Sequence, residues 1–255
     1  MILLPLTIAM GAAQADPKAG RHLVLSEDYA HMRQVDTKVW KFDDGPVYNN
    51  EKEKYTNEAG HNAWIENKQL VIEARKDGTT ITSARLESFK SWSHPYVEVV
   101  AKVPQGRGTW PAVWMLNDRL RNKGTKGAVG WPQCGEVDIM ENVGYDPPGF
   151  HFSLHCGKYN WMKPQQRTKV LQVPDPQKFH KFAVDMRADR IVFSCDGKPA
   201  YTVDNTEHTF DAWPFDDSYY LILNLAIGGN WGGSKGIDDS IFPTRYYIKS
   251  VKVWD

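Results

Sequence analysis

Cysteine is scarce in this 255-residue sequence, and its scarcity limits how the fold can be held together. The three cysteines, Cys134, Cys156 and Cys195, form no C-x-x-C pair, which argues against a zinc ribbon and against a fully paired disulfide framework. One bridge among them stays open. Buried free thiols are the favoured interpretation, because a chain of this length can bury enough core to be stable without covalent links.

Net charge is absent as well. Lys and Arg together number 31, as do Asp and Glu, so the formal charge is zero. Nucleic-acid-binding proteins usually carry clustered basic residues, so the balance predicts no nucleic-acid partner. It also mildly disfavours a sulfated polysaccharide.

Long apolar runs are few, and one of them opens the chain. Residues Ile2 to Met10 are largely apolar, and Ala13-Gln14-Ala15 has the small residues of a cleavage site. The pattern predicts a signal peptide over residues 1–15, a single domain over residues 16–255, and a secreted, periplasmic or cell-surface protein. The run is too short to cross a bilayer, and no other stretch is long enough, so no membrane association is expected after its removal.

Motifs of two large enzyme classes are missing. The sequence has no G-x-S-x-G motif, which a serine hydrolase of the α/β class would carry. The glycine-rich run from Gly228 to Gly236 lacks the Gly-Lys-Ser/Thr ending of a phosphate loop. Nucleotide chemistry is therefore excluded, and no cofactor is expected.

Strand and turn patterns fill most of the chain. Residues 96–103 alternate between apolar and other side chains, and Asp77-Gly78 and Asp196-Gly197 have the composition of hairpin turns. Residues 219–226 form a nearly continuous apolar run, in which Asn224 is the exception and must find a polar partner. With no convincing amphipathic helix, the pattern predicts an all-β sandwich.

Three carboxylates lie within the run Gly135 to Asn142. In a regular strand, Glu136 and Asp138 share a face while Glu141 falls on the opposite one. One extra residue, assigned to Met140, would form a β-bulge and return Glu141 to the face of the other two acids. The sequence therefore predicts three acids along one cleft.

Two facing carboxylates suit retaining glycoside hydrolysis, which needs an ionised nucleophile and a protonated acid. Glu136 and Glu141 fit these roles, and Asp138 between them could share a proton with Glu136. A solvent-facing acidic edge strand is disfavoured by the apolar residues between the acids. A calcium loop is disfavoured because ligands at alternate positions around a central glycine are missing.

Several segments with these acids resemble glycoside hydrolase family 16, from about Val35 to the C-terminus. The matching segments are Asn50-Glu51 with Tyr55, residues 82–85, residues 108–116, the acidic run, Leu154-His155 and residues 220–231. The acidic run with its extra residue is similar to the bulged, laminarinase-like branch, whereas lichenase-like members look regular at this strand. The resemblance implies a jelly-roll sandwich with a concave substrate-binding cleft.

Aromatic residues are abundant, with ten Trp, eleven Tyr and ten Phe, and indoles suit stacking on sugar rings as well as core packing. Trp110 and Trp114 share a strand parity, and the glycines and proline around them favour an irregular entry to a cleft over a packed strand centre. Trp131 and Trp231 lie in loop-like segments where the resemblance also implies aromatic sugar contacts.

Polar candidates complete the predicted sugar site. Arg85 could donate several hydrogen bonds to hydroxyl groups, and Asn224 is expected to face the cleft. The resemblance implies that Asn49, or the next residue, contacts glucan hydroxyls and that His155 lies near the cleavage point. His151 is interpreted as structural.

One position departs from the family pattern. Where many members carry an Asp that helps to bind calcium, this chain has Lys249, and an ammonium group cannot ligate calcium. Lys249 has the parity of Val251, so it is expected to point inward. The resemblance implies Glu27 or Asp28 as its partner, because the family's N-terminal calcium ligands lie there. No metal site is therefore predicted.

Together these features predict a monomeric, secreted, retaining endo-β-1,3-glucanase that acts on a polysaccharide. A mixed-linkage β-1,3-1,4-glucanase and an agarase or galactan hydrolase stay open as alternatives on the same scaffold. A glucan-binding jelly-roll lectin is the non-enzymatic alternative, although a lectin would be expected to lose at least one Glu.

Overall fold

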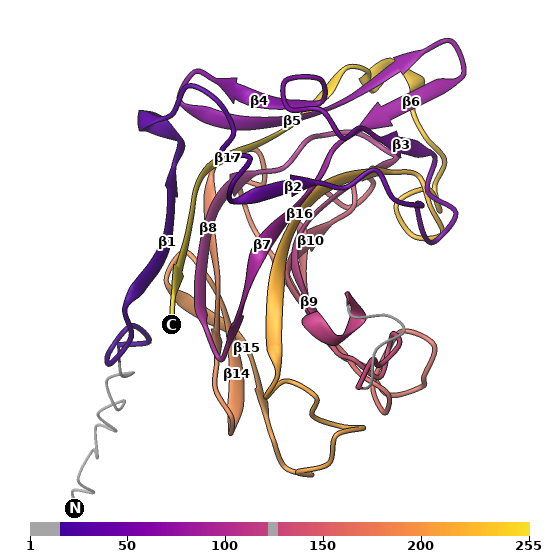
Figure 1. The fold of residues 1–255 in the computed structure, drawn as a ribbon. Helices are drawn as coiled ribbons and strands as arrows, with labels where there is room; N and C mark the ends of the chain where they lie inside the picture. The colour runs from indigo at the N-terminus through magenta and orange to yellow at the C-terminus, as the bar shows by residue number, and fades with distance from the viewer. Residues whose placement is uncertain (1–15, 122–126) are drawn as a thin grey trace, which may run out of the picture.

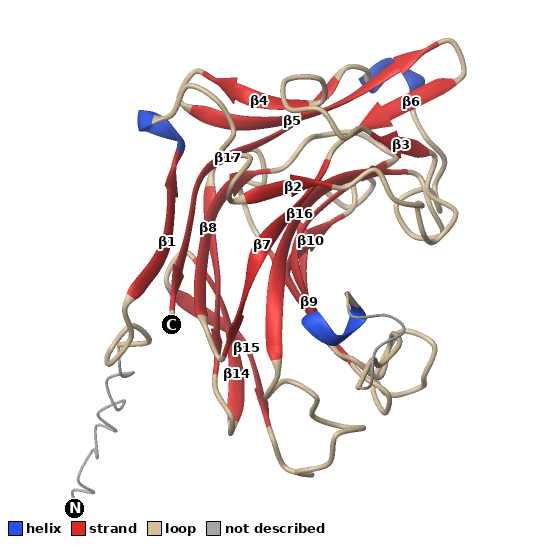
Figure 2. Cartoon of the chain, in the orientation of Figure 1, coloured by secondary structure: helices blue, strands red, loops and turns tan. Residues whose placement is uncertain are grey.

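The computed structural model describes residues 16–121 and 127–255, and nearly all regular structure in it is β-strand (Figures 1 and 2). The predicted signal peptide, residues 1–15, lies outside the described residues. In chain order the strands are β1 (Leu23–Asp28), β2 (Trp40–Phe42), β3 (Glu53–Tyr55), β4 (Ala63–Glu66), β5 (Gln69–Asp77), β6 (Thr80–Ser83), β7 (Arg85–Ser93), β8 (Tyr96–Lys102), β9 (Thr109–Asn117), β10 (Glu136–Asn142), β11 (Gly149–His155), β12 (Arg167–Gln172), β13 (His180–Met186), β14 (Arg190–Cys195), β15 (Lys198–Asp204), β16 (Ser218–Ile227) and β17 (Thr244–Trp254). Short 3-10 helices are η1 (Tyr29–His31), η2 (Asp118–Leu120) and η3 (Asp239–Ile241). None of the helices in the described ranges is long and apolar enough to span a membrane.

The strands form two sheets that pack as a sandwich. The seven-stranded sheet has the order β12-β11-β10-β9-β16-β7-β2. The ten-stranded sheet has the order β15-β14-β13-β8-β17-β5-β6-β3, with β1 added beside β17 and β4 beside β5. Figure 1 shows β17 running between β8 and β5, although it is the last strand of the chain. The prediction of an all-β jelly-roll sandwich is confirmed.

The core lies between the two sheets, and strand alternation fills it from both sides. In β8 the alternating residues Val97, Val99 and Ala101 are buried, as the sequence predicts. β16 lies between β9 and β7 and is buried along nearly its whole length. Its one amide, Asn224, is also buried and finds polar partners, so the predicted central strand is confirmed.

The predicted turns and thiols are also observed. The predicted hairpin between β5 and β6 is observed, but its two loop residues are Gly78 and Thr79, because Asp77 still pairs with Thr80. Asp196-Gly197 links β14 to β15 with φ angles of 51° and 77°. Positive φ at both central residues is the geometry that Asp-Gly hairpins favour. The three cysteines are buried and free, so no covalent link holds the fold.

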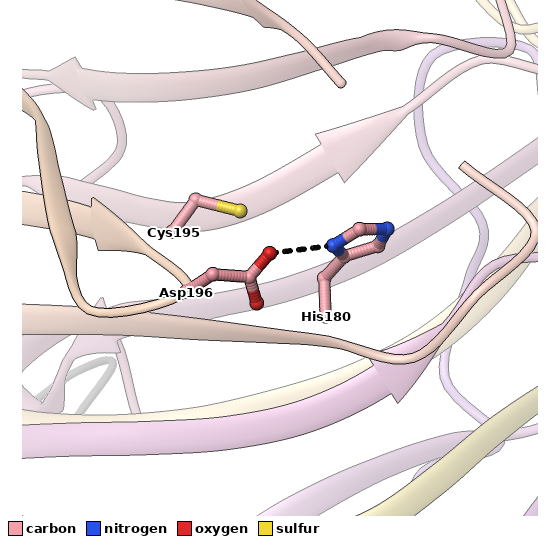
Figure 3. Close-up of side chains that lie close together, drawn as sticks. All are labelled: His180, Cys195 and Asp196. Carbon is pink, nitrogen blue, oxygen red and sulfur yellow. Dashed lines mark hydrogen bonds and ion pairs between the residues drawn. The ribbon is translucent and has the colours of Figure 1, made fainter. Parts of the chain in front are cut away.

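His180 and Asp196 clamp the β13–β14 hairpin (Figure 3). His180 Nδ1 lies 2.8 Å from Asp196 Oδ2, and His180 Nε2 lies 2.8 Å from the Asp175 carbonyl oxygen. The Lys181 amide donates to the other Asp196 oxygen at 2.9 Å. Cys195 completes a trio whose potential ligand atoms lie within 4.8 Å of one another, but burial raises the pKa of its thiol to about 12. Because both ring nitrogens and both carboxylate oxygens are already engaged, we interpret the trio as structural.

The C-terminal strand is irregular at Lys249. The register of β17 against β8 shifts between Ile248 and Ser250, so Lys249 is an extra residue in a β-bulge. The bulge reverses the alternation of faces beyond it, so that Val251 is buried while Lys249 is exposed. The Lys249 ammonium lies 4.2 Å from the centroid of the Phe179 ring.

The predicted ion pair between Lys249 and Glu27 or Asp28 is therefore wrong. Glu27 is buried, its pKa is raised by burial, and it accepts a hydrogen bond from the Trp40 indole at 3.3 Å. Asp28 caps η1 by accepting from the Ala30 amide at 3.2 Å. Sequence parity assigns Lys249 to the wrong face because it assumes a regular strand. The idea that this ammonium takes the place of a calcium ion fails with it.

Candidate active site

A β-bulge in β10 sets the orientation of the three acids. Against β11, Asp138 pairs with Ser153 and Glu141 with His151, so β10 has one residue more than its partner between these pairs. Against β9 the shift falls between Asp138 and Met140, which leaves Ile139 unpaired. The predicted bulge is confirmed, but its extra residue on the β9 side is Ile139 and not Met140.

The bulge divides apolar and acidic residues between the two faces of β10. Val137, Ile139 and Met140 are fully buried and belong to the main core. Two consecutive residues can both face the core only because the strand is irregular there. Glu136 and Glu141 remain partly exposed, and Asp138 is buried. The strand thus places its acids along the outer face of the seven-stranded sheet.

Each outer acid accepts a hydrogen bond from an indole. Trp131 Nε1 donates to Glu136 Oε2 at 3.1 Å, and Trp110 Nε1 donates to Glu141 Oε1 at 2.9 Å. His155 lies on the adjacent strand opposite Glu136. Its Nε2 is 3.2 Å from Asp138 Oδ2 and 3.9 Å from Glu136 Oε1. The Glu136 end of the cluster therefore has two nitrogen groups beside it, whereas the structure gives Glu141 one.

Burial and mutual repulsion make the cluster hold protons. Burial raises the pKa of Glu136, of Asp138 and of Glu141 to about 8. For the two glutamates these values include the charge of Asp138, which raises the pKa, and the indole hydrogen bonds and His155, which lower it. Groups this close lose their protons in steps that belong to the set. The set can therefore contain an ionised and a protonated carboxyl at one pH.

These raised pKa values predict that the protein is more stable at pH 5 than at pH 8. An unfolded carboxyl loses its proton near pH 4, but the folded site keeps protons up to about pH 8. Between these values the folded state binds more protons, so the free energy of unfolding falls as pH rises, by about 1.4 kcal/mol per pH unit for each retained proton. Thermal unfolding measured across this range should show a falling Tm, and Asp138→Asn should flatten the fall. A wild-type Tm that rises from pH 5 to pH 8 would contradict the prediction.

A polar network lies beside the acids on β9, β16 and β7. Trp114 Nε1 donates to Asn224 Oδ1 at 2.8 Å, and Asn224 Nδ2 donates to the Tyr55 hydroxyl at 3.0 Å. Arg85 packs against Trp114, with its guanidinium carbon 5.1 Å from the ring centroid. Arg85 Nη2 donates to Glu87 at 2.8 Å, and Arg85 Nε lies 3.6 Å from Asp43 Oδ2. Two carboxylates therefore hold the guanidinium in place beside Trp114.

The loop after β16 closes the Glu141 end of the face. Trp231 meets Trp110 edge-to-face with ring centroids 5.3 Å apart, and it meets His151 in the same way at 4.7 Å. The Asn230 amide donates to the Asn49 carbonyl at 2.7 Å, which ties the two loops together. Gly229 has a φ of 76°, and a Cβ there would lie 3.2 Å from the Trp110 ring, so the close approach requires glycine.

Every predicted site residue lies at or beside this face, and their roles remain predictions. Trp114 is half-buried in the middle of β9, so the expected irregular entry does not apply to it, but Trp110 is the second residue of the strand and follows a loop in which Gly106 and Gly108 have φ angles of 103° and 102°. The shared orientation of the two indoles is observed. His151, interpreted as structural, contacts Trp231 and so borders the cleft. Tyr55 was not predicted as a site residue. The sequence did offer a reason to look for such a residue, because the amide of buried Asn224 requires a polar partner and the Tyr55 hydroxyl is that partner.

Comparison with known proteins gives matches along most of the chain. The family model described as "Glycosyl hydrolases family 16" matches residues 49–246. A "Beta-glucanase" of Rhodothermus marinus is 35% identical over 258 residues, which cover 96% of this chain and 89% of that protein. The laminarinase structure from Flavobacterium sp. UMI-01 is 38% identical with a TM-score of 0.83, over 92% of this chain and 100% of that chain. SCLam, a non-specific endo-β-1,3(4)-glucanase, is 34% identical with a TM-score of 0.84, over 93% of this chain and 92% of that chain.

Proposed function

The chain belongs to glycosyl hydrolase family 16 and is a β-glucan hydrolase, and from this premise we propose that it cuts internal β-1,3 linkages with retention of configuration. The observation that carries the proposal is the bulge in β10, which puts two indole-bonded glutamates on one face. Retaining hydrolysis uses one carboxylate as nucleophile and one carboxylic acid as proton donor.

In the first step, Glu136 attacks the anomeric carbon while Glu141 gives its proton to the leaving oxygen. The glycosidic bond breaks, and an ester forms between the sugar and Glu136. In the second step, Glu141 takes a proton from water, and the water oxygen attacks the anomeric carbon and releases Glu136. Two inversions leave the configuration unchanged. Glu141 gives up its proton in the first step and regains one from water in the second, so the site ends in its starting protonation state.

The surroundings of the two glutamates support this division of roles. Trp131 donates to Glu136, and His155 with its proton on Nε2 would direct it at the Asp138 and Glu136 oxygens. Donors favour the ionised form of a carboxyl, which a nucleophile needs. The charge of Asp138 raises the pKa of both glutamates, so the difference between them lies in the His155 nitrogen, which is 3.9 Å from Glu136. Among the described residues, Glu141 has only the Trp110 indole as a hydrogen-bond donor, which leaves its protonated form the more favoured of the two.

The walls of the face suit a neutral sugar chain. Indole rings stack on sugar faces, and Arg85, Asn224 and Tyr55 offer donors and acceptors for hydroxyl groups. The β-1,3 preference rests on the laminarinase relatives. A mixed-linkage β-1,3-1,4-glucanase is the second candidate, favoured by the similarity to a non-specific endo-β-1,3(4)-glucanase. A non-enzymatic lectin would be expected to lack Glu136 or Glu141, but this chain has both, which disfavours the lectin alternative.

Digestion of laminarin, barley mixed-linkage glucan and agarose tests the proposal. We expect laminarin to be cut into oligosaccharides of several lengths, barley glucan more slowly and agarose not at all. Proton NMR of the first products should show the β-anomer before mutarotation. Initial release of the α-anomer would overturn retention, and release of monosaccharide alone would overturn endo-cleavage. Fastest cleavage of barley glucan would favour the second candidate.

We further propose that the enzyme is secreted. Residues 1–15 have the composition of a signal peptide. A polysaccharide too large to enter a cell must be cut outside it, so export agrees with the proposed substrate. Expression with the native N-terminus, followed by sequencing of the product from the medium, should give a mature protein that begins at Asp16.

A further inference from the structure

Trp161 is an exposed indole in the loop between β11 and β12. The sequence has ten tryptophans, all within the described ranges, and Trp161 alone among them is exposed, with 53% of its surface accessible. Its neighbour Met162 is also 53% exposed, so two large apolar side chains lie together at the surface of this loop. Adjacent exposed apolar side chains of this kind can mark a binding site. Neither the core nor the catalytic acids account for this exposure.

The turn that carries Trp161 is firmly built. Asn160 is buried, and its Nδ2 donates to the carbonyl oxygens of Cys156 and Gly157 at 2.9 and 3.3 Å. Its Oδ1 accepts from the Met162 amide at 3.1 Å, so the amide side chain is bonded on both sides of Trp161. The backbone around the indole is therefore held in place before any ligand arrives.

Trp161 continues a row of rings that begins at the catalytic site. Its ring stacks on Trp131, with centroids 6.4 Å apart and 29° between the planes. Trp131 donates to Glu136 and lies 6.3 Å from the His155 ring. Trp131 also packs against a small apolar cluster of Leu116, Tyr220 and Ile222 in the seven-stranded sheet. The row therefore leads outward from the proposed nucleophile.

The row runs from beside the polar network toward β11. Trp131 and Trp114 pack against the same cluster on β9 and β16, whereas His155 is on β11 and Trp161 lies in the loop that follows that strand. A sugar chain that passes the acids and Trp131 in this direction would next meet Trp161. Neutral flat rings without a charged partner suit the apolar faces of glucosyl units.

We propose that Trp161 forms an outer sugar-binding subsite beyond Trp131, which recognises an additional glucosyl residue of a long β-glucan. This subsite rests on the proposed function, because it deepens the substrate preference of the same cleft. It makes Trp161 a residue that determines preference for chain length. It takes no part in the bond-breaking step.

The test uses β-1,3-linked gluco-oligosaccharides of increasing length. Trp161→Ala should lower kcat/KM by about tenfold for long oligosaccharides, mainly through KM, and leave the shortest cleaved substrate unchanged. Trp161→Phe keeps a ring and should recover most of the loss. Leu23→Ala is the matched control, because Leu23 is equally exposed, at 52%, but lies on β1 of the other sheet.

The outcomes separate the subsite from the proposed function. If the wild-type enzyme leaves every β-1,3 oligosaccharide intact, the proposed function fails. If the wild type prefers long substrates and Trp161→Ala keeps the same preference, the subsite is overturned while the function stands. An equal loss for short and long substrates would also overturn it, since a damaged fold would slow every substrate alike. A length-dependent loss confined to Trp161→Ala supports the subsite.

Discussion

Glu136→Gln is expected to abolish hydrolysis, with a fall in kcat of roughly 10^4-fold or more. The amide is nearly the same size as the carboxyl and can still accept the Trp131 hydrogen bond. It cannot form the glycosyl ester, so the first chemical step has no nucleophile. Binding of oligosaccharide should persist, as measured by calorimetry. The variant should fold, since it replaces a carboxyl that burial already disfavours in its charged form.

Two comparisons make the assignment of roles testable. Glu141→Gln should recover much of its lost rate with an aryl glycoside whose leaving group needs no protonation, whereas Glu136→Gln should not. Glu66→Gln alters a glutamate on β4 of the other sheet, where it pairs with Arg245, and should keep full activity. Substantial activity in Glu136→Gln, or its recovery with the activated substrate, would show that another group is the nucleophile.

Inserting one alanine between Met140 and Glu141 is expected to abolish hydrolysis as completely as Glu136→Gln does. The added residue would take the cleft-facing position, and Glu141 would turn toward the core. Deleting Ile139 should instead leave the enzyme active. The deletion removes the residue that lacks a partner on β9, so Asp138, Met140 and Glu141 would alternate regularly and all three acids would keep their face.

The two changes can be compared directly by activity and thermal unfolding. Loss of the fully buried Ile139 side chain should destabilise the deletion variant by about 2–5 kcal/mol while it still hydrolyses glucan at 20 °C or below. Circular dichroism establishes whether each variant is folded. A folded deletion variant as inactive as the insertion variant would mean that the bulge itself, and not the shared face, is what catalysis requires.

Sequence patterns predict the parts of this molecule that depend on local chemistry. The hairpin turns, the alternation in β8 and the burial of Asn224 all follow from side-chain type and spacing. A bulge in β10 follows too, because three acids must share one face. The identity of the extra residue does not follow, since Ile139 and Met140 are both apolar and only the register against β9 distinguishes them.

The failures share one physical cause. Lys249 is misplaced because a bulge in β17 depends on how that strand pairs with β8, and nothing in its own sequence reveals this pairing. The row formed by Trp131 and Trp161 is missed for a similar reason. The two residues are joined by a contact between loops, and neither sits in a periodic segment that would indicate a shared face.

The sheet order has a consequence for how the chain must be made. β17 contains residues 244–254, yet it lies between β8 and β5 and also pairs with β1. During synthesis the ten-stranded sheet therefore lacks an internal strand until these residues leave the ribosome. Sheets built from such distant pairings form slowly, because the chain must close long loops first. A nascent chain without this strand cannot complete its sheet and stays unfolded. An unfolded chain is the form in which a polypeptide can be translocated across a membrane.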